Sequence, residues 1–176
     1  MFEVKDIVQI IAIPLITVFL AHLLDQKKSK NKTRAENDRK LFLDLRNVFE
    51  IDGDLIYLFR DHSVGDLIHR DYMKHAHKLE TLIGGPGFIF SNRKMENLRK
   101  DMHSKLCEYL NTTSKNLFVK KTQPNYYELR YREKVQEYDD PEIMNKFTTL
   151  AKDIDDLASE IYLAYRRIAE IAQKQL

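Results

Sequence analysis

The sequence has few of the residues on which disulfide-bonded, metal-binding and phosphate-loop proteins depend. A single cysteine, Cys107, excludes a disulfide within the chain and leaves no group of thiols to bind a metal ion. We expect its side chain to be a small buried apolar group in a protein of the reducing cytoplasm. The one glycine-rich stretch, residues 84–87, lacks the lysine of a phosphate-binding loop and is explained as the end of a helix.

Catalytic residues in the spacing that enzymes require are also lacking. His69, Arg70 and Asp71 form the tripeptide of a kinase catalytic loop, but no glycine-rich loop or metal-binding triplet accompanies them. His75 and His77 are two residues apart on an expected helix, so their side chains point about 200° apart and do not share a metal ion. We therefore expect no enzymatic activity, no cofactor and no metal site.

One long apolar run is present, at residues 7–24. Its eighteen residues carry no charge, which is near the lower limit of the roughly 20 helical residues that cross a hydrocarbon core of about 30 Å. Five of the ten residues from 25 to 34 are basic, so the positive-inside rule predicts that the chain beyond this run is cytoplasmic. We predict a single-pass protein of the inner membrane, with a transmembrane helix at residues 7–24 and a basic juxtamembrane stalk at residues 25–40.

Two other interpretations of this apolar run are weaker. A cleaved secretory signal begins with basic residues, whereas here the basic residues follow the run. A buried helix of a soluble protein is not usually followed by an uninterrupted polar stretch such as residues 25–40.

In a spanning helix, polar and kink-forming residues face other helices or water, so the predicted pore-lining residues are Gln9, Pro14, Thr17 and His22.

Beyond residue 40 the apolar residues follow helical spacing, and the signal for strands is weak. We therefore predict an all-α fold with a cytoplasmic helical domain at residues 41–176. The stalk contains no helix-breaking residue, so the N-terminal helix is free to continue through it. Segment 111–125 is the least periodic, and residues 117–119 within it fit either a short strand or a packed loop. Three helices are expected in the first part of this domain: one over residues 41–59, one over residues 64–83, and one that begins after an N-cap at Ser91. The first of them has a weak point at Asp52 and Gly53.

Residues 141–174 show the strongest periodicity and predict one long helix that begins at Pro141. At about 1.5 Å per residue this helix is about 50 Å long. Its apolar residues are spaced alternately four and three, which is the heptad pattern of a coiled coil. The pattern fits a helix of an intramolecular bundle and a self-associating helix equally well. The candidate oligomer-interface residues are Phe147, Leu150, Ile154, Leu157, Ile161 and Ile168.

A basic region lies between residues 91 and 134, where basic residues outnumber acidic ones by eleven to five. Aromatic residues are interleaved with the basic ones, and this combination is what binds single-stranded nucleic acid by stacking and phosphate neutralisation. A solvated helix pair whose tyrosines seal the core explains the same residues. Another polyanion or the headgroups of the inner leaflet would use the same charges. The candidate ligand-binding residues are Arg93, Lys94, Lys120, Lys121, Tyr126, Tyr127, Arg130, Tyr131 and Arg132.

The arrangement of these segments resembles the small membrane effectors of bacterial antiphage defence systems, and most nearly the Hailong-type effector. The matching features are the span at 7–24, the helices over 41–83, the basic region 93–134 and the heptads over 143–171. The resemblance rests on architecture and transfers no functional residue. It implies a homo-oligomer, specifically a tetramer, whose spanning helices form or open a pore under the control of a nucleotide or oligonucleotide. It also implies that any enzymatic activity belongs to a partner protein.

Three functions therefore remain open. The first is a gated, toxic pore in the membrane. The second is a membrane-tethered adaptor that holds nucleic acid or a protein partner at the bilayer. The third is a scaffold without a pore, assembled through the heptads. The polar residues within the span favour the first.

Overall fold

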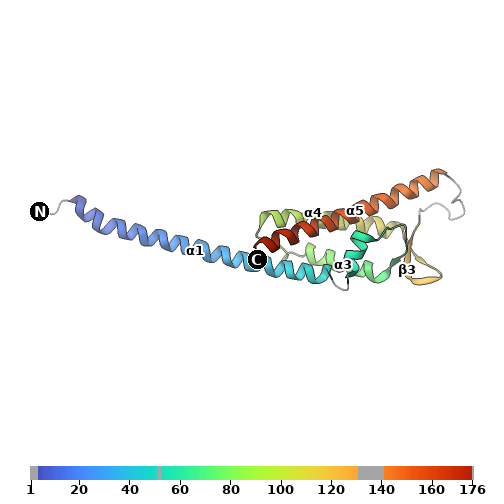
Figure 1. Cartoon of the computed structure of the whole chain (residues 1–176), viewed down its shortest axis with the longest axis horizontal. Coiled ribbons are helices and arrows are strands. Elements are labelled where there is room, and N and C mark those ends of the chain that lie inside the picture. The colour runs from blue at the N-terminus through green and yellow to red at the C-terminus, as the bar shows by residue number, and fades with distance from the viewer. Residues whose placement is uncertain (1–3, 51–52, 131–140, 176) are drawn as a thin grey trace. The chain divides into compact units, whose positions relative to one another are not determined.

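The chain divides into two compact units, Met1–Asn37 and Asp38–Leu176. Most of it is helical (Figure 1), which confirms the predicted all-α fold class at this level. The computed structural model describes the backbone of residues 4–50, 53–130 and 141–175, and the side chains of residues 19–20, 22–50, 53–130 and 141–174.

The described elements are helices with one small sheet between them. The helices are α1 (Val4–Phe49), α2 (Asp54–Ile56), α3 (Arg70–Gly84), α4 (Arg93–Asn116) and α5 (Pro141–Gln175), and a π-helical turn, η2 (Tyr57–Asp61), follows α2 directly. The sheet contains strands β1 (Ile68–His69), β2 (Leu117–Lys120) and β3 (Gln123–Leu129), which are antiparallel and have the spatial order β1-β3-β2.

Helix α1 passes through residues 25–40 without interruption, as the lack of a helix-breaking residue there predicts. Among the residues whose side chains are described, no helix is both long and apolar enough to cross a membrane. The side chains of Gln9, Pro14 and Thr17, which were predicted to line a pore, lie outside the described residues. His22, the fourth such residue, is exposed, and its Nε2 accepts a hydrogen bond of 2.9 Å from the side-chain amide of Gln26.

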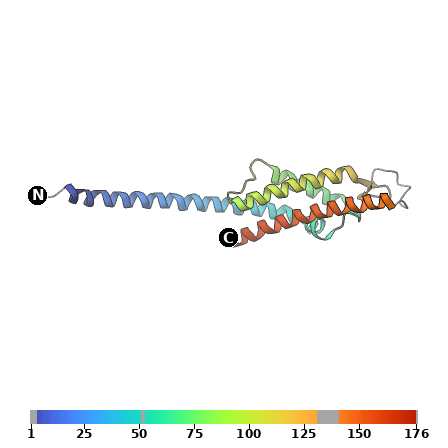
Figure 2. The same ribbon diagram turned by 90° about the horizontal axis from the view of Figure 1, so that it is seen from above.

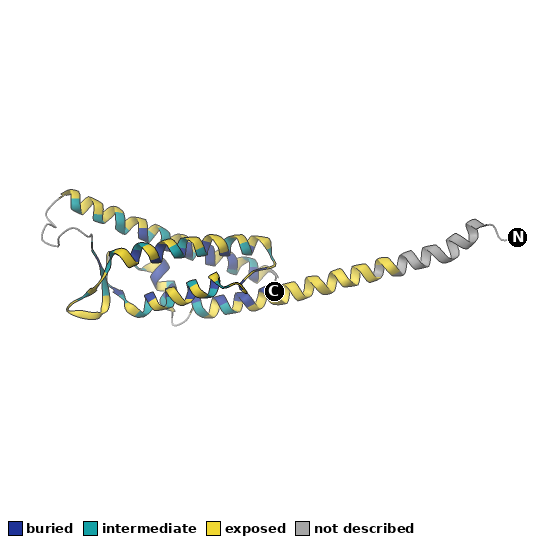
Figure 3. Ribbon diagram, turned by 180° about the vertical axis from the view of Figure 1, so that it is seen from behind, coloured by how far each residue is buried: buried dark blue, intermediate teal, exposed yellow. Residues whose placement is uncertain are grey.

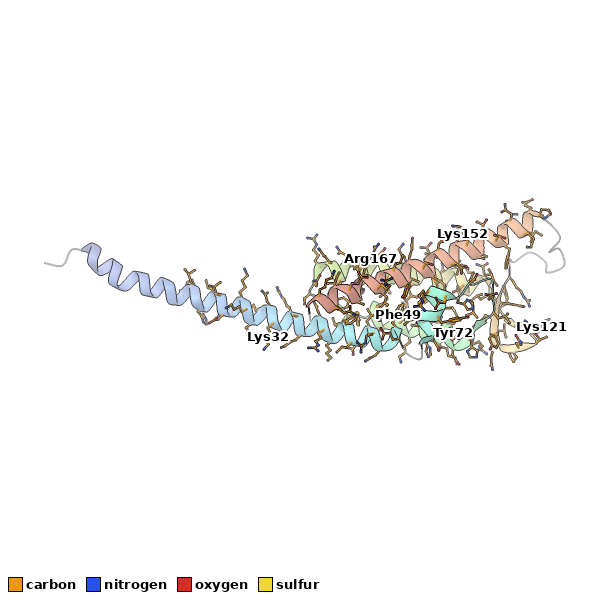
Figure 4. The ribbon with its side chains drawn as sticks, in the orientation of Figure 1. Lys32, Phe49, Tyr72, Lys121, Lys152 and Arg167 are labelled. Carbon is orange, nitrogen blue, oxygen red and sulfur yellow. The ribbon has the colours of Figure 1, made fainter. Side chains whose placement is uncertain are left out.

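The second unit is a helical bundle in which α4 and α5 lie side by side and run in opposite directions (Figures 1 and 2). Buried residues are concentrated within this bundle (Figure 3). Aromatic rings join its elements, because Phe49 of α1 stacks on Tyr165 of α5 with ring centroids 3.9 Å apart, and Phe59 of η2 meets Tyr109 of α4 edge to face at 5.4 Å. Figure 4 labels Phe49 within the bundle. Rings of this size supply a large share of the apolar area that stabilises a small domain.

Helix α5 begins at Pro141 as predicted, but its heptad residues are used within the chain. Ile154, Ile161 and Ile168 are fully buried in the core of the bundle. Three of the candidate oligomer-interface residues therefore pack in the core of one protomer, as the intramolecular interpretation of the heptads predicts. The other three, Phe147, Leu150 and Leu157, are partly buried against the same core.

The starts of two helices differ from the predicted positions. Helix α4 is capped by Asn92 and not by Ser91, because the Asn92 side chain accepts hydrogen bonds from the backbone N–H groups of Lys94 and Met95. The Ser91 N–H instead donates to the Asp38 carboxylate, at 2.6 Å. The predicted weak point before α2 is confirmed at Gly53, which has a φ of 74° that glycine adopts without strain.

Helix α3 begins at Arg70, six residues after the predicted start at Val64. The intervening residues form a turn at 64–66 and then strand β1, in which Ile68 pairs with Tyr127. Val64 is held in a turn by Asp155 of α5, whose carboxylate accepts its N–H at 2.8 Å. Both Val64 and Ile68 are buried, so their helix-like spacing reflects burial and not a helix.

The β2–β3 hairpin occupies most of segment 111–125, the least periodic part of the sequence. A strand at residues 117–119 was one of the two predicted alternatives, and β2 confirms it. The partner strand β3 was not predicted. Its outer part is exposed on both faces, which removes the alternation of apolar and polar residues that marks a strand.

Candidate functional site

A cavity of about 330 Å³ lies where α3, α4 and the β2–β3 hairpin meet. We call it the basic pocket. Three of its lining residues, Arg70, Lys74 and His77, are spaced four and three apart on α3 and therefore share one face of that helix. The remaining walls come from apolar, hydroxyl and aromatic side chains: Met73, Leu110, Thr113, Ser114, Leu117 and Tyr127.

Arg70 is the exposed residue at the centre of this arrangement. Its guanidinium carbon lies 5.8 Å from the centroid of the Tyr127 ring, and its Nη1 donates a hydrogen bond of 3.5 Å to the Pro124 carbonyl. The contact with the ring is a cation–π interaction between two residues that line the pocket. The sheet produces this contact, because the pairing of β1 with β3 places Tyr127 beside the first residue of α3.

Lys74 has an acidic neighbour that reduces the positive charge of the pocket. Its Nζ lies 2.5 Å from Asp71 Oδ1, and this hydrogen bond is the main reason that the pKa of Asp71 is lowered. Asp71 also faces His69, whose Nδ1 lies 3.5 Å from its Oδ2. Arg70 and Lys74 together carry two positive charges against the one negative charge of Asp71, so the entrance is cationic.

A second hollow, of about 410 Å³, adjoins the basic pocket and shares Arg70 and Lys74 with it. His69 and Asn125 complete its lining together with Asp71. The ring of Tyr126 meets that of His69 edge to face, with centroids 5.1 Å apart. The two hollows therefore share two basic side chains, and each has an aromatic ring in its lining.

Of the predicted ligand-binding residues, the structure brings two tyrosines to these hollows. Tyr127 lines the basic pocket, and Tyr126 stands beside the second hollow. Lys120 and Lys121 lie at the end of the hairpin, where Figure 4 shows Lys121. Arg130 pairs with Glu128 and lies over the Phe118 ring. Tyr131 and Arg132 lie outside the described residues.

Arg93 and Lys94 are in the first turn of α4, far from the basic pocket. The pocket residue Thr113 is nineteen residues further along the same helix, which is about 30 Å at 1.5 Å per residue. The basic region predicted from sequence is therefore not one surface. Its candidate ligand-binding residues separate to the two ends of α4: Arg93 and Lys94 begin the helix, and the others belong to the hairpin region that follows it.

Arg70, Lys74 and His77 were not predicted as ligand-binding residues. The signal that marks them is the spacing of three basic or titratable side chains at 70, 74 and 77, on the polar side of an amphipathic helix. Arg70 was considered only as part of a kinase-like tripeptide. The involvement of α4 and β3 in the same cavity was not accessible from local sequence.

Cys107 is only partly buried, which corrects the expectation of a buried apolar side chain. Its neighbours are polar: its Sγ lies 3.6 Å from His103 Nε2. Burial and the charge of Glu80 raise the pKa of its thiol. Among the described residues, Glu80, His103 and Cys107 form the group whose side-chain atoms are close enough to share a metal ion.

Comparisons with models of protein families, with curated proteins and with solved structures find no match to this chain.

Proposed function

We propose that this chain is a membrane-anchored effector whose helical domain binds a phosphate-bearing ligand of the nucleotide or oligonucleotide type. The observation that carries the proposal is the convergence of Arg70, Lys74 and the Tyr127 ring on one pocket of about 330 Å³. This volume is at the lower end of the range for small-molecule sites and suits one nucleotide unit.

The side chains of the pocket suit both the phosphate and the base of such a ligand. A guanidinium binds phosphate oxygens through two parallel hydrogen bonds, and an ammonium adds a compact positive charge. A tyrosine ring offers a stacking surface to a base, and Arg70 already lies over the ring of Tyr127. The hydroxyl of Ser114 and the apolar side chains of α4 provide the remaining contacts.

The anchor is supported by the sequence of residues 7–24 together with the basic residues that follow them. We propose that this segment spans the inner membrane with the bundle on the cytoplasmic side. In the effector function, the segments of several copies, four by the architectural resemblance, form a pore lined by Gln9, Thr17 and the kink at Pro14. Binding in the basic pocket then controls the pore, and a separate enzyme supplies or removes the ligand.

A membrane-tethered adaptor without a pore is the second candidate, and the burial pattern of α5 favours it. The heptad residues Ile154, Ile161 and Ile168 are satisfied inside one protomer, so this helix does not need a partner helix to cover them. In that case the basic pocket serves only to hold its ligand close to the bilayer. The mass of the purified protein in detergent separates a tetramer from a monomeric tether.

The ligand half of the proposal is tested with the full chain in detergent and a fluorescent, short single-stranded DNA oligonucleotide. Arg70→Ala removes a charge-assisted contact worth about 1.5–3 kcal/mol, so we expect about 10- to 100-fold weaker binding. Lys94→Ala removes the same charge at the other end of α4 and is the matched control, for which we expect little change. Equal losses for both variants, or no binding by the unaltered chain, would overturn the assignment of the pocket.

A further inference from the structure

A second group of side chains lies on the same two helices as the basic pocket, about one turn further from the hairpin. Glu80 belongs to α3, three residues after the pocket residue His77, and Cys107 belongs to α4, three residues before the pocket residue Leu110. His103 precedes Cys107 by four residues and so shares its face of α4. The helix packing thus brings together one nitrogen, one sulfur and one oxygen ligand.

The distances between these atoms are those of a tetrahedral metal site. His103 Nε2 lies 3.6 Å from Cys107 Sγ and 3.6 Å from Glu80 Oε1, and all three ligand atoms are within 4.8 Å of one another. Bonds of about 2.0–2.3 Å to a common zinc ion at tetrahedral angles separate neighbouring ligand atoms by about 3.3–3.8 Å. Two of the three separations match this range, and the third, between the Glu80 and Cys107 ligand atoms, is at most 4.8 Å.

The direct interactions between the three side chains are weak. A separation of 3.6 Å between His103 Nε2 and the Glu80 carboxylate is longer than a hydrogen bond, and a thiol is a poor donor or acceptor. The arrangement therefore gains little from the side chains alone. A cation bound between them would use all three.

Gly84 leaves the space in which the histidine ring sits against α3. A Cβ atom at position 84 would lie 2.6 Å from His103 Nε2, which is closer than such atoms approach one another. Any larger residue at this position must displace the ring nitrogen from its present place. The last residue of α3 is therefore part of the geometry that places the nitrogen ligand.

We propose that Glu80, His103 and Cys107 bind a zinc ion. A set with one thiolate, one imidazole and one carboxylate suits this borderline metal better than calcium or magnesium, which prefer oxygen ligands alone. A thiolate and a carboxylate together balance the two positive charges of the ion. The side chains of His103 and Glu80 are 31% and 35% exposed to solvent, so water can occupy the fourth coordination position.

Zinc at this site would join the end of α3 to the middle of α4 and brace two walls of the basic pocket. Binding replaces the thiol proton of Cys107, since the thiolate is the form that coordinates the metal ion. Affinity for the metal should therefore fall as the pH is lowered. This inference does not depend on the ligand of the basic pocket or on insertion into a membrane.

Titration of the tag-free full chain with Co²⁺ in detergent tests the proposal, because Co²⁺ occupies zinc sites and gives a charge-transfer band only when bound to thiolate. The chain has one cysteine, so such a band reports on Cys107 alone. We expect the band to appear with one Co²⁺ per chain and to disappear when Zn²⁺ is added. We expect Cys107→Ser to abolish it, and His103→Gln, Glu80→Gln and Gly84→Ala each to weaken Zn²⁺ binding at least about tenfold.

Glu108→Gln is the matched control, because this exposed acid follows Cys107 directly and does not face the other two ligands. Its Zn²⁺ affinity should equal that of the unaltered chain. Thermal unfolding of every protein is followed by circular dichroism with and without Zn²⁺, and the metal should raise the unfolding temperature of the unaltered chain and the control alone. Absence of the charge-transfer band in the unaltered chain, or a folded Cys107→Ser variant with unchanged Zn²⁺ affinity, would overturn the site.

Discussion

Asp38 connects α1 to the start of α4, and its replacement by alanine should destabilise the bundle more than the replacement of an exposed residue of α1. Its side chain is almost completely covered, with 6% of its surface exposed. The two carboxylate oxygens accept the backbone N–H groups of Ser91 and Asn92 at 2.6 and 2.8 Å. These bonds fix the loop that presents the cap of α4.

The magnitude follows from the two bonds. Hydrogen bonds to a charged group contribute about 1.5–3 kcal/mol each, and Ser91 is exposed enough for water to replace part of the loss. We therefore expect Asp38→Ala to lower the free energy of unfolding by about 2–4 kcal/mol. For a domain of this size, each kcal/mol corresponds to roughly 3–5 °C, so the unfolding temperature should fall by about 10 °C.

The assay is thermal unfolding of the full chain in detergent, followed by circular dichroism. Asp44→Ala is the control, since Asp44 is an acid on the same helix that is only partly buried, and we expect a change within about 0.5 kcal/mol. An unfolding temperature of Asp38→Ala equal to that of the unaltered chain would refute the role of the carboxylate. So would an equal loss in Asp44→Ala, because the effect would then be that of removing a helix charge.

Three further substitutions have expected outcomes. The pKa of Glu96 is lowered chiefly by its hydrogen bonds from Arg99. The stabilisation by this carboxylate is therefore present above the ordinary carboxyl pKa and is lost as the pH falls through the lowered value. In Glu96→Gln, the unfolding temperature measured against pH should fall less steeply at acid pH than in the unaltered chain. Tyr165→Phe keeps the ring stack but loses the 2.6 Å hydrogen bond from its hydroxyl to Glu50, so urea unfolding should show a loss of about 1 kcal/mol, and no loss would mean that this bond is replaced by water. Ile161→Asp places a charge in a fully buried position and should unfold the bundle, as measured by circular dichroism. A variant that stays folded but has a different oligomer mass would show instead that Ile161 lies in an interface between protomers.

The helices were predictable wherever apolar spacing and helix-ending residues agree. The start of α5 at Pro141 and the end of α3 at Gly84 are of this kind. The prediction of a helix failed where apolar residues are buried by a turn or a strand. Val64 and Ile68 have helical spacing, but Val64 lies in a turn and Ile68 in strand β1. The cap of α4 was displaced by one residue because Ser91 and Asn92 are both good capping residues, and the local sequence does not distinguish between them.

The candidate sites were less accessible for a topological reason. The basic pocket combines Arg70, Thr113 and Tyr127, which no local pattern connects. Charge counting grouped the residues at both ends of α4 because it ignores the length of the helix. For the proposed zinc site, the spacing of His103 and Cys107 is visible in the sequence, but the position of Glu80 depends on the packing of α3 on α4.

Ion flux across vesicles that contain the purified full chain tests the proposed effector most directly. We expect the single-stranded oligonucleotide, added on the side of the helical domain, to change the flux of the unaltered chain and to leave that of Arg70→Ala unchanged. Replacing Gln9 and Thr17 by leucine should abolish the flux without preventing insertion, because the segment becomes more apolar. Vesicles that never pass ions, with or without the oligonucleotide, would contradict the pore and favour the membrane-tethered adaptor. An Arg70→Ala variant that responds like the unaltered chain would contradict control through the basic pocket.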